Sequence, residues 1–201
     1  MYCSTNKNKF SVGILLCFVF LLSACNKKPV VGSMYNIDSL VTAQINFLSD
    51  NKARLEKTAF ISGQKDDSVY VPSGRLAWKN ELEIFSQLQA INKPINRDYY
   101  IIDDNLFDPS SNLTVKAFSA IEKLPVRYLR VFYQESIQKP RKIEALYHDE
   151  NELYKSGRKL IMEFRQINNK SVLTSYMIEG GEKMLLGDTV SFFINGNIII
   201  Q

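Results

Sequence analysis

The chain has 201 residues, with 25 Lys and Arg, 21 Asp and Glu, three Cys and a single His. Its net charge of +4 is far below the strong basic excess of a generic nucleic-acid binder, so no nucleic-acid partner is expected. One imidazole excludes any site that needs two, including the common zinc sets. The length suits one domain with a sizeable core.

The first element in chain order is an apolar run over residues 10–22, preceded by Lys7 and Lys9. Its thirteen residues are too few for a membrane-spanning helix, which needs about 20. Small residues follow the run. A basic start, an apolar centre and a small-residue end are typical of a secretory signal peptide. We therefore expect this segment to be removed on export.

The tetrapeptide Leu22-Ser23-Ala24-Cys25 resembles the lipobox of bacterial lipoproteins. The resemblance implies that Cys25 is lipidated, that a dedicated peptidase cuts before it, and that its lipid holds the protein on a membrane. The domain boundaries that follow are 1–24 for the signal peptide, 25–35 for the lipidated Cys and a flexible tether, and 36–201 for a single α+β domain. The alternatives are an ordinary signal peptide with an incidental Cys, or an uncleaved anchor.

A cleaved lipobox has two further consequences. Cys3 and Cys17 lie in the segment to be removed, so the mature domain can form no internal disulfide and must rely on its core. Asn26 stands where lipoproteins retained at the inner membrane carry Asp. The resemblance therefore favours the outer membrane over the inner one, with the protein facing the periplasm.

Two amphipathic helices are expected at the start of the domain. The first begins near Asp38 and carries Val41, Ile45 and Leu48 at helical spacing. Its end is open, because Leu55 can continue the apolar side of the helix, or residues 55–61 can form a strand that leads into a turn at 63–67, with Val69 and Val71 on the return.

The second helix is expected over residues 73–91, with Ser73 as its cap and an end near Pro94. Its apolar side includes Trp78 and Phe85. A lone Trp can line a binding site, but the largest residue of an apolar helix stripe is more often part of the core. We interpret Trp78 as a core residue.

Beyond residue 99 the apolar period becomes two, which predicts strands. Seven candidate strands, separated by turn residues, lie at residues 99–106, 113–121, 126–134, 142–148, 159–167, 171–179 and 189–200. Short gaps between them predict an antiparallel meander. In residues 126–133 both faces of the expected strand carry large apolar side chains, so part of the sheet should be covered on both sides.

These elements predict an α+β fold in which two N-terminal helices pack on a curled antiparallel meander of about six to seven strands. Two helices can cover one face of only some of these strands. We therefore expect an open sheet or a half barrel.

No catalytic motif is present. The patterns of a nucleophile elbow, a phosphate-binding loop, a zinc protease, an EF-hand and a dinucleotide fold do not occur. The acid pairs at 66–67 and 103–104 are explained by turn chemistry, since adjacent strand residues point to opposite faces. His148 lies at a strand end, where a solvated His is common. We expect no catalytic residue, no cofactor and no metal, and predict that the chain is not an enzyme.

Three functions stay open. The first is a non-catalytic binding or accessory lipoprotein of the cell envelope, with an envelope protein as its partner. The second is a carrier or receptor for an apolar, lipid-like ligand, because a curled sheet backed by helices resembles in outline the lipoprotein-sorting factors that hold acyl chains. The third is a hydrolase built from scattered Ser, Asp and Tyr, which no residue pattern supports.

Positive charge is concentrated in one part of the chain. Residues 123–170 contain eleven Lys and Arg against six Asp and Glu. Four of these cations, near candidate strand ends, form a possible surface for an anionic lipid or polymer: Arg141, Lys142, Arg158 and Lys159. The alternative is a solvated face on which Glu144 and Glu163 pair with cations across the strands.

Overall fold

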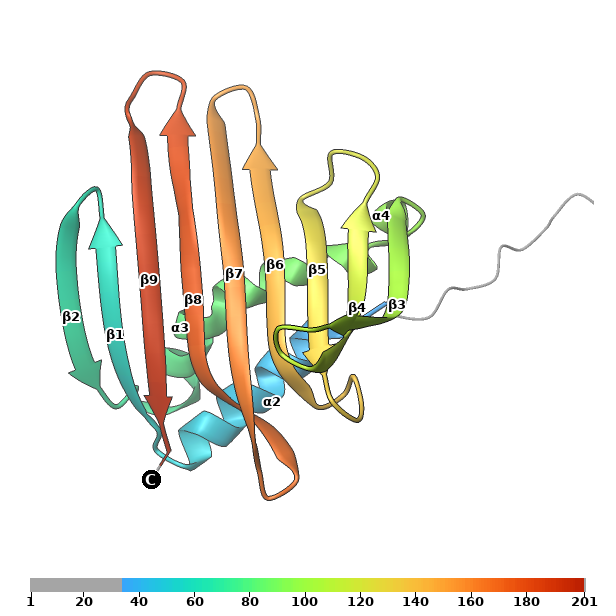
Figure 1. Cartoon of the computed structure of the whole chain (residues 1–201). Coiled ribbons are helices and arrows are strands. Elements are labelled where there is room, and N and C mark those ends of the chain that lie inside the picture. Colours follow the sequence, from blue (N-terminus) through green and yellow to red (C-terminus); the bar gives the residue numbers. More distant parts are fainter. Residues whose placement is uncertain (1–33, 201) are drawn as a thin grey trace, which may run out of the picture. The chain divides into compact units, whose positions relative to one another are not determined.

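Nine strands form one antiparallel sheet in the computed structural model, which describes residues 34–200 (Figure 1). The strands are β1 (Arg54–Ile61), β2 (Gln64–Tyr70), β3 (Tyr100–Asp108), β4 (Leu113–Ala120), β5 (Val126–Tyr133), β6 (Pro140–Glu150), β7 (Tyr154–Ile167), β8 (Lys170–Met184) and β9 (Thr189–Ile199). Their order in space is β2-β1-β9-β8-β7-β6-β5-β4-β3. The sheet is therefore open, with β2 and β3 at its edges.

The helices are α2 (Ile37–Asp50), α3 (Gly74–Ser86), the 3₁₀ helix η2 (Gln87–Asn92) and the short α4 (Pro94–Arg97). Both α2 and α3 lie on one face of the sheet (Figure 1). At the start of α2 the Asn36 side chain accepts a hydrogen bond from the Ser39 amide, at 2.9 Å, which satisfies one of the free N–H groups of the first turn.

The α+β class and the antiparallel sheet are confirmed, but the expected counts of two helices and six to seven strands are both wrong. The two additional strands are β1 and β2, where the helical and strand readings competed. Helix α2 ends at Asp50, and Lys52 takes a left-handed backbone conformation with φ of 48°. The chain then leaves the helix as β1, which pairs with both β2 and the last strand, β9.

The expected second helix is also wrong beyond Ser86, where the chain tightens into η2. Leu88 and Ile91 are both fully buried in this segment. Residues three apart lie on the same side of a 3₁₀ helix, so the tighter turn directs both side chains into the core.

The core fills the space between the helices and the sheet. Trp78 and Phe85 of α3 have no exposed surface, which confirms their prediction as core residues. The rings of Phe85 and Tyr176 pack edge to face, with 5.9 Å between their centroids. Buried Gln44 of α2 donates to the Ser171 carbonyl at 3.0 Å and accepts from the Leu173 amide at 2.8 Å. These bonds fix α2 against the start of β8.

Part of the opposite face is also covered, as expected for β5. Val131 faces the helices and Phe132 the other side, and both are buried. Phe132 lines a recess together with Asp103 and Leu106 of β3, and the end of the β3–β4 hairpin bends across β5 (Figure 1). The β3–β4 hairpin therefore covers this part of the sheet face that the helices leave open.

Candidate binding surfaces

Strand register separates the four cations that were expected to form an anionic-ligand surface. Side chains alternate between faces along a strand. Arg158 therefore shares the helix-covered face with buried Leu160, whereas Arg141 is the extra residue at a register shift between β5 and β6. The adjacent residues, Lys142 and Lys159, lie on the opposite face.

The four cations also lie at different heights along the sheet. Lys142 pairs with Glu163, whereas Leu146, four residues further along β6, pairs with Lys159. Four residues of strand correspond to about 13 Å. The structure thus does not bring Arg141, Lys142, Arg158 and Lys159 together as one surface.

Arg158 is part of an ion-paired cluster on the helix-covered face. It donates to the Glu182 carboxylate at 2.6 Å and to the Tyr154 hydroxyl at 3.1 Å. Burial lowers the pKa of Arg158, but the hydrogen bonds and charges of Glu182 and Tyr154 together outweigh burial and raise the pKa above its ordinary value. The same bond lowers the pKa of Glu182. The charge of Arg158 is already neutralised.

Lys142 belongs to a recess of about 410 Å³ on the face that the helices leave uncovered. Val115, Ala117 and Phe132 lie in this recess, and Lys142 donates to Glu144 at 3.1 Å. Burial raises the pKa of Glu144, but the hydrogen bond from Lys142 and the charges of nearby lysines lower it below its usual value overall. An anion would have to displace this carboxylate.

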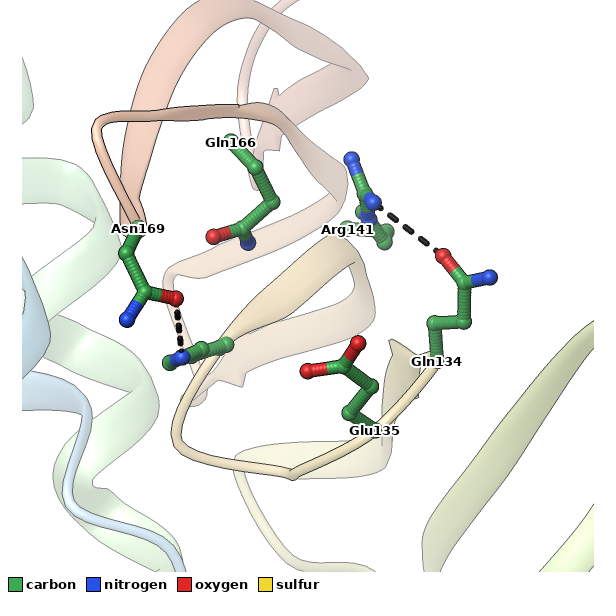
Figure 2. A pocket seen from close by; sticks show the side chains of 6 residues that line it. Gln134, Glu135, Arg141, Gln166 and Asn169 are labelled. Atoms are coloured by element: carbon green, nitrogen blue, oxygen red, sulfur yellow. Dashed lines mark hydrogen bonds between the residues drawn. The ribbon is translucent and has the colours of Figure 1, made fainter.

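Arg141 lies in a polar recess of about 320 Å³ at the end of the sheet where the β5–β6 loop meets the β7–β8 turn (Figure 2). It donates to Gln134 at 3.1 Å, and Lys139 donates to Asn169 at 2.5 Å. The remaining lining residues are Glu135 and Gln166. Two cations and three side-chain amides suit an anionic or polyhydroxylated group, and Glu135 opposes a tightly held anion.

The polar recess depends on local turn chemistry. Asn168 and Asn169 both have positive φ, of 49° and 63°. Two consecutive left-handed residues form the tight turn that suits a two-residue hairpin, and Asn tolerates this conformation better than most residues. The turn places the Asn169 side chain opposite Lys139.

A second surface, at the other end of the sheet, is apolar. We define the apolar tip as four exposed side chains at the ends of the β6–β7 and β8–β9 hairpins, with exposed fractions of 62 to 95%: Leu153, Met184, Leu185 and Leu186. The Leu185 amide donates to the Leu153 carbonyl at 2.9 Å, which joins the two hairpin ends. The four exposed residues therefore lie on two adjoining hairpin ends.

The apolar tip was not predicted from the sequence. Its signal is the run Met184-Leu185-Leu186 directly before Gly187 and Asp188. Turn residues there predict a hairpin end, which is ordinarily polar. Three large apolar residues at such a place are the indication of a contact surface.

One further polar cluster lies under α3. Glu81 accepts from Lys57 at 2.7 Å, from the Tyr70 hydroxyl at 3.2 Å and from the Tyr176 hydroxyl. Burial raises the pKa of Tyr176 well above its ordinary value, so this hydroxyl stays protonated as a donor. The carboxylate is held by three donors and joins α3 to the sheet, which is a structural arrangement.

Within residues 34–200, no group of three or more His, Cys, Asp or Glu is placed to hold a metal ion. No helix of this part of the chain is long and apolar enough to cross a bilayer. Cys25 and the expected signal peptide lie outside the described residues, so the lipid anchor stays a prediction. No family model matches the chain, and no curated protein and no solved structure is similar to it.

Proposed function

We propose that the protein is a lipid-anchored, non-catalytic binding component of a bacterial cell envelope, and that it docks a partner protein through the apolar tip. The observation that carries this proposal is the exposure of Leu153, Met184, Leu185 and Leu186 on two adjoining hairpin ends. Contiguous apolar side chains at a surface mark interaction sites more often than they mark free loops.

The charge around the apolar tip indicates the chemistry of the partner. Residues 149–155 and 182–190 contain five acidic residues against two basic ones. Lys155 pairs with Glu150 at 2.7 Å, and Glu182 pairs with Arg158, which leaves an acidic surplus beside the leucines. A complementary partner has an apolar pocket with Lys or Arg on its rim. An anionic bilayer would repel this end.

The carrier alternative has less support. Among the described residues, the helix-covered face is filled by core side chains of the sheet and of both helices, with Trp78, Phe85 and Tyr176 at its centre. The recess on the other face includes Arg130, Lys142 and Glu144 among its lining residues. A site for an acyl chain is expected to be mostly apolar.

The anchor rests on the lipobox. Lipidation of Cys25 would tie the domain to the membrane, with the outer membrane and a periplasmic orientation as the favoured placement. One acyl chain gives only reversible binding, whereas two or more hold a protein stably. A permanently anchored domain without a recognisable catalytic group is suited to presenting a docking surface.

Site-specific photo-crosslinking in intact cells tests the proposal. A photoreactive amino acid at position 186 should give one discrete protein adduct, whereas the same probe at Ile95, which is also highly exposed, should not. Leu153→Ser should abolish the adduct because it removes an apolar neighbour. Asp188→Lys should weaken it if the partner has a basic rim. Equal adducts at positions 186 and 95, or adducts with lipid only, would contradict the docking role.

A further inference from the structure

The two ends of the sheet differ in the sign of their charge. The end formed by the β5–β6 loop and the β7–β8 turn, residues 134–142 and 163–172, contains five basic residues against two acidic ones. We call it the basic end; its cations are Lys139, Arg141, Lys142, Arg165 and Lys170. The ranges that surround the apolar tip carry the opposite excess, five acidic residues against two basic ones.

Most cations of the basic end are not neutralised. Lys142 pairs with Glu144, but Lys139 and Arg141 donate to the neutral amides of Asn169 and Gln134. Within the described part of the chain, Arg165 and Lys170 are exposed and form no ion pair with a carboxylate. Asp108, the last residue of β3, lines a recess with Lys142 and reduces the excess of positive charge without removing it.

The start of the domain lies beside the basic end. The Tyr35 hydroxyl donates to the Ile137 carbonyl in the β5–β6 loop at 3.3 Å. Met34 and Tyr35 line one surface recess together with Ile137 and Gln138. The chain therefore enters the domain beside the β5–β6 loop, next to Ile137 and Gln138.

Chain length limits how far the basic end can be from a lipid on Cys25. Nine peptide units join Cys25 to Met34, and covalent geometry limits this separation to about 32 Å. The apolar tip lies at the opposite end of β7, whose 14 residues span about 40 Å or more.

We infer that the basic end docks on the phosphate headgroups of an anionic membrane, so that the domain stands upright with the apolar tip turned away from the bilayer. This inference shares the anchor at Cys25 with the proposed function, but the docking contact itself needs no lipid on the protein. Lys and Arg close to an anionic leaflet are attracted over roughly one Debye length, about 8 Å at physiological salt.

The polar recess of Figure 2 gives this contact its chemistry. Arg141 and Lys139 line it together with the amides of Gln166 and Asn169, which are donors for phosphate oxygens. Glu135 lies in the same recess and opposes a single tightly bound phosphate. The contact is therefore a diffuse, salt-sensitive one with many headgroups.

An orientation measurement on the full lipidated protein tests the inference. Because Cys25 is the only cysteine of the mature chain, Leu186→Cys provides a unique thiol for a dye at the apolar tip. Energy transfer to labelled headgroups should be weak in vesicles that contain phosphatidylglycerol. It should increase severalfold in neutral phosphatidylcholine vesicles, where the domain is free to tilt.

Charge variants separate docking from the anchor. Reversing Lys139, Arg141, Arg165 and Lys170 to Glu should raise transfer in anionic vesicles to the neutral value, and Arg165→Gln with Lys170→Gln should do so in part. The matched control reverses Lys155 and Lys183 at the opposite end, which should change nothing. Circular dichroism checks that each variant is folded. Equal transfer from wild type and both basic-end variants in anionic vesicles would overturn the inference.

The mass of the purified chain tells the two hypotheses apart. An unmodified Cys25 would refute the proposed anchor alone, and the same chain would then be sedimented with anionic and neutral vesicles. Preferential sedimentation with anionic vesicles at low salt, reduced at least tenfold in the Glu variant and at ~0.15 M salt, would still support docking. Equal sedimentation with both kinds of vesicle would refute it.

Discussion

Gly196 of β9 lies against the ring of Tyr176 in the neighbouring strand, β8. A Cβ atom at position 196 would be 2.3 Å from Cε1 of that ring, which no folded protein tolerates without movement. The two residues are direct partners in the β8–β9 ladder. The absence of a side chain at Gly196 allows the Tyr176 ring to lie flat over β9, where its hydroxyl reaches Glu81 of α3.

Gly196→Ala should therefore destabilise the domain. The added methyl group displaces Tyr176 and with it the contacts to Phe85 and Glu81, and overpacking of this kind typically costs about 1 to 3 kcal/mol. Urea denaturation measures the change. Gly187→Ala is the control, since its Cβ would meet only Met184 at 4.0 Å. Equal unfolding midpoints for the two variants would show that the sheet accommodates the methyl group.

Tyr100 should make the domain sensitive to alkaline pH. Burial raises the pKa of Tyr100 from 10.0 to about 12, and its hydroxyl donates to the Val126 carbonyl at 2.7 Å. Because the folded-state pKa is the higher one, this contribution to stability is complete below pH 10 and is lost as the pH rises towards 12.

Thermal unfolding from pH 8 to 12 checks this expectation. Tyr100→Phe should lose roughly 1 kcal/mol at neutral pH, where the hydrogen bond is missing, and should show a shallower decline above pH 10. Burial also raises the pKa values of Tyr35 and Tyr176. These two residues therefore cause a loss of stability at alkaline pH that the wild type and Tyr100→Phe share. Parallel curves for wild type and variant would refute the assignment to Tyr100.

Trp78 should be the most costly single truncation in α3. Its side chain is fully buried, and replacing such a residue with Ala typically costs about 3 to 5 kcal/mol. Leu76→Ala in the same helix is a matched control, since Leu76 is 70% exposed and should change the free energy of unfolding by less than about 0.5 kcal/mol. Similar losses from both variants would contradict the assignment of Trp78 to the core, because Ala is the better helix former and helix propensity alone would cause no loss.

Cys25→Ala tests the lipid anchor directly. Without the thiol there is no group to acylate, so the variant should accumulate as an uncut precursor that takes up no labelled fatty acid. Metabolic labelling and the mobility of the protein on a gel report both effects. Cys17→Ala, within the expected signal peptide, is the control and should be processed normally. A mature, labelled Cys25→Ala protein would show that the lipobox interpretation is wrong.

Local pattern was sufficient for much of the fold. The helical spacing around Val41 and Trp78 and the alternation after residue 99 reflect burial on one side of a regular element, which neighbouring residues encode directly. The end of α3 at Ser86 could not be predicted in the same way, because the local spacing of apolar residues fits both an α-helix and a 3₁₀ helix. Which of the two forms depends on how Leu88 and Ile91 pack in a core that is built by distant strands.

The nine-stranded sheet and its surfaces required the tertiary structure. Residues 54–61 pair as β1 both with the neighbouring β2 and with β9, at the other end of the chain, and no local pattern contains the contact with β9. The same is true of the candidate sites. Arg141 and Arg158 look alike in the sequence, yet strand register gives one an amide partner and the other a carboxylate. Composition determined the number of charges, and the pairing of distant strands decided which of them are neutralised.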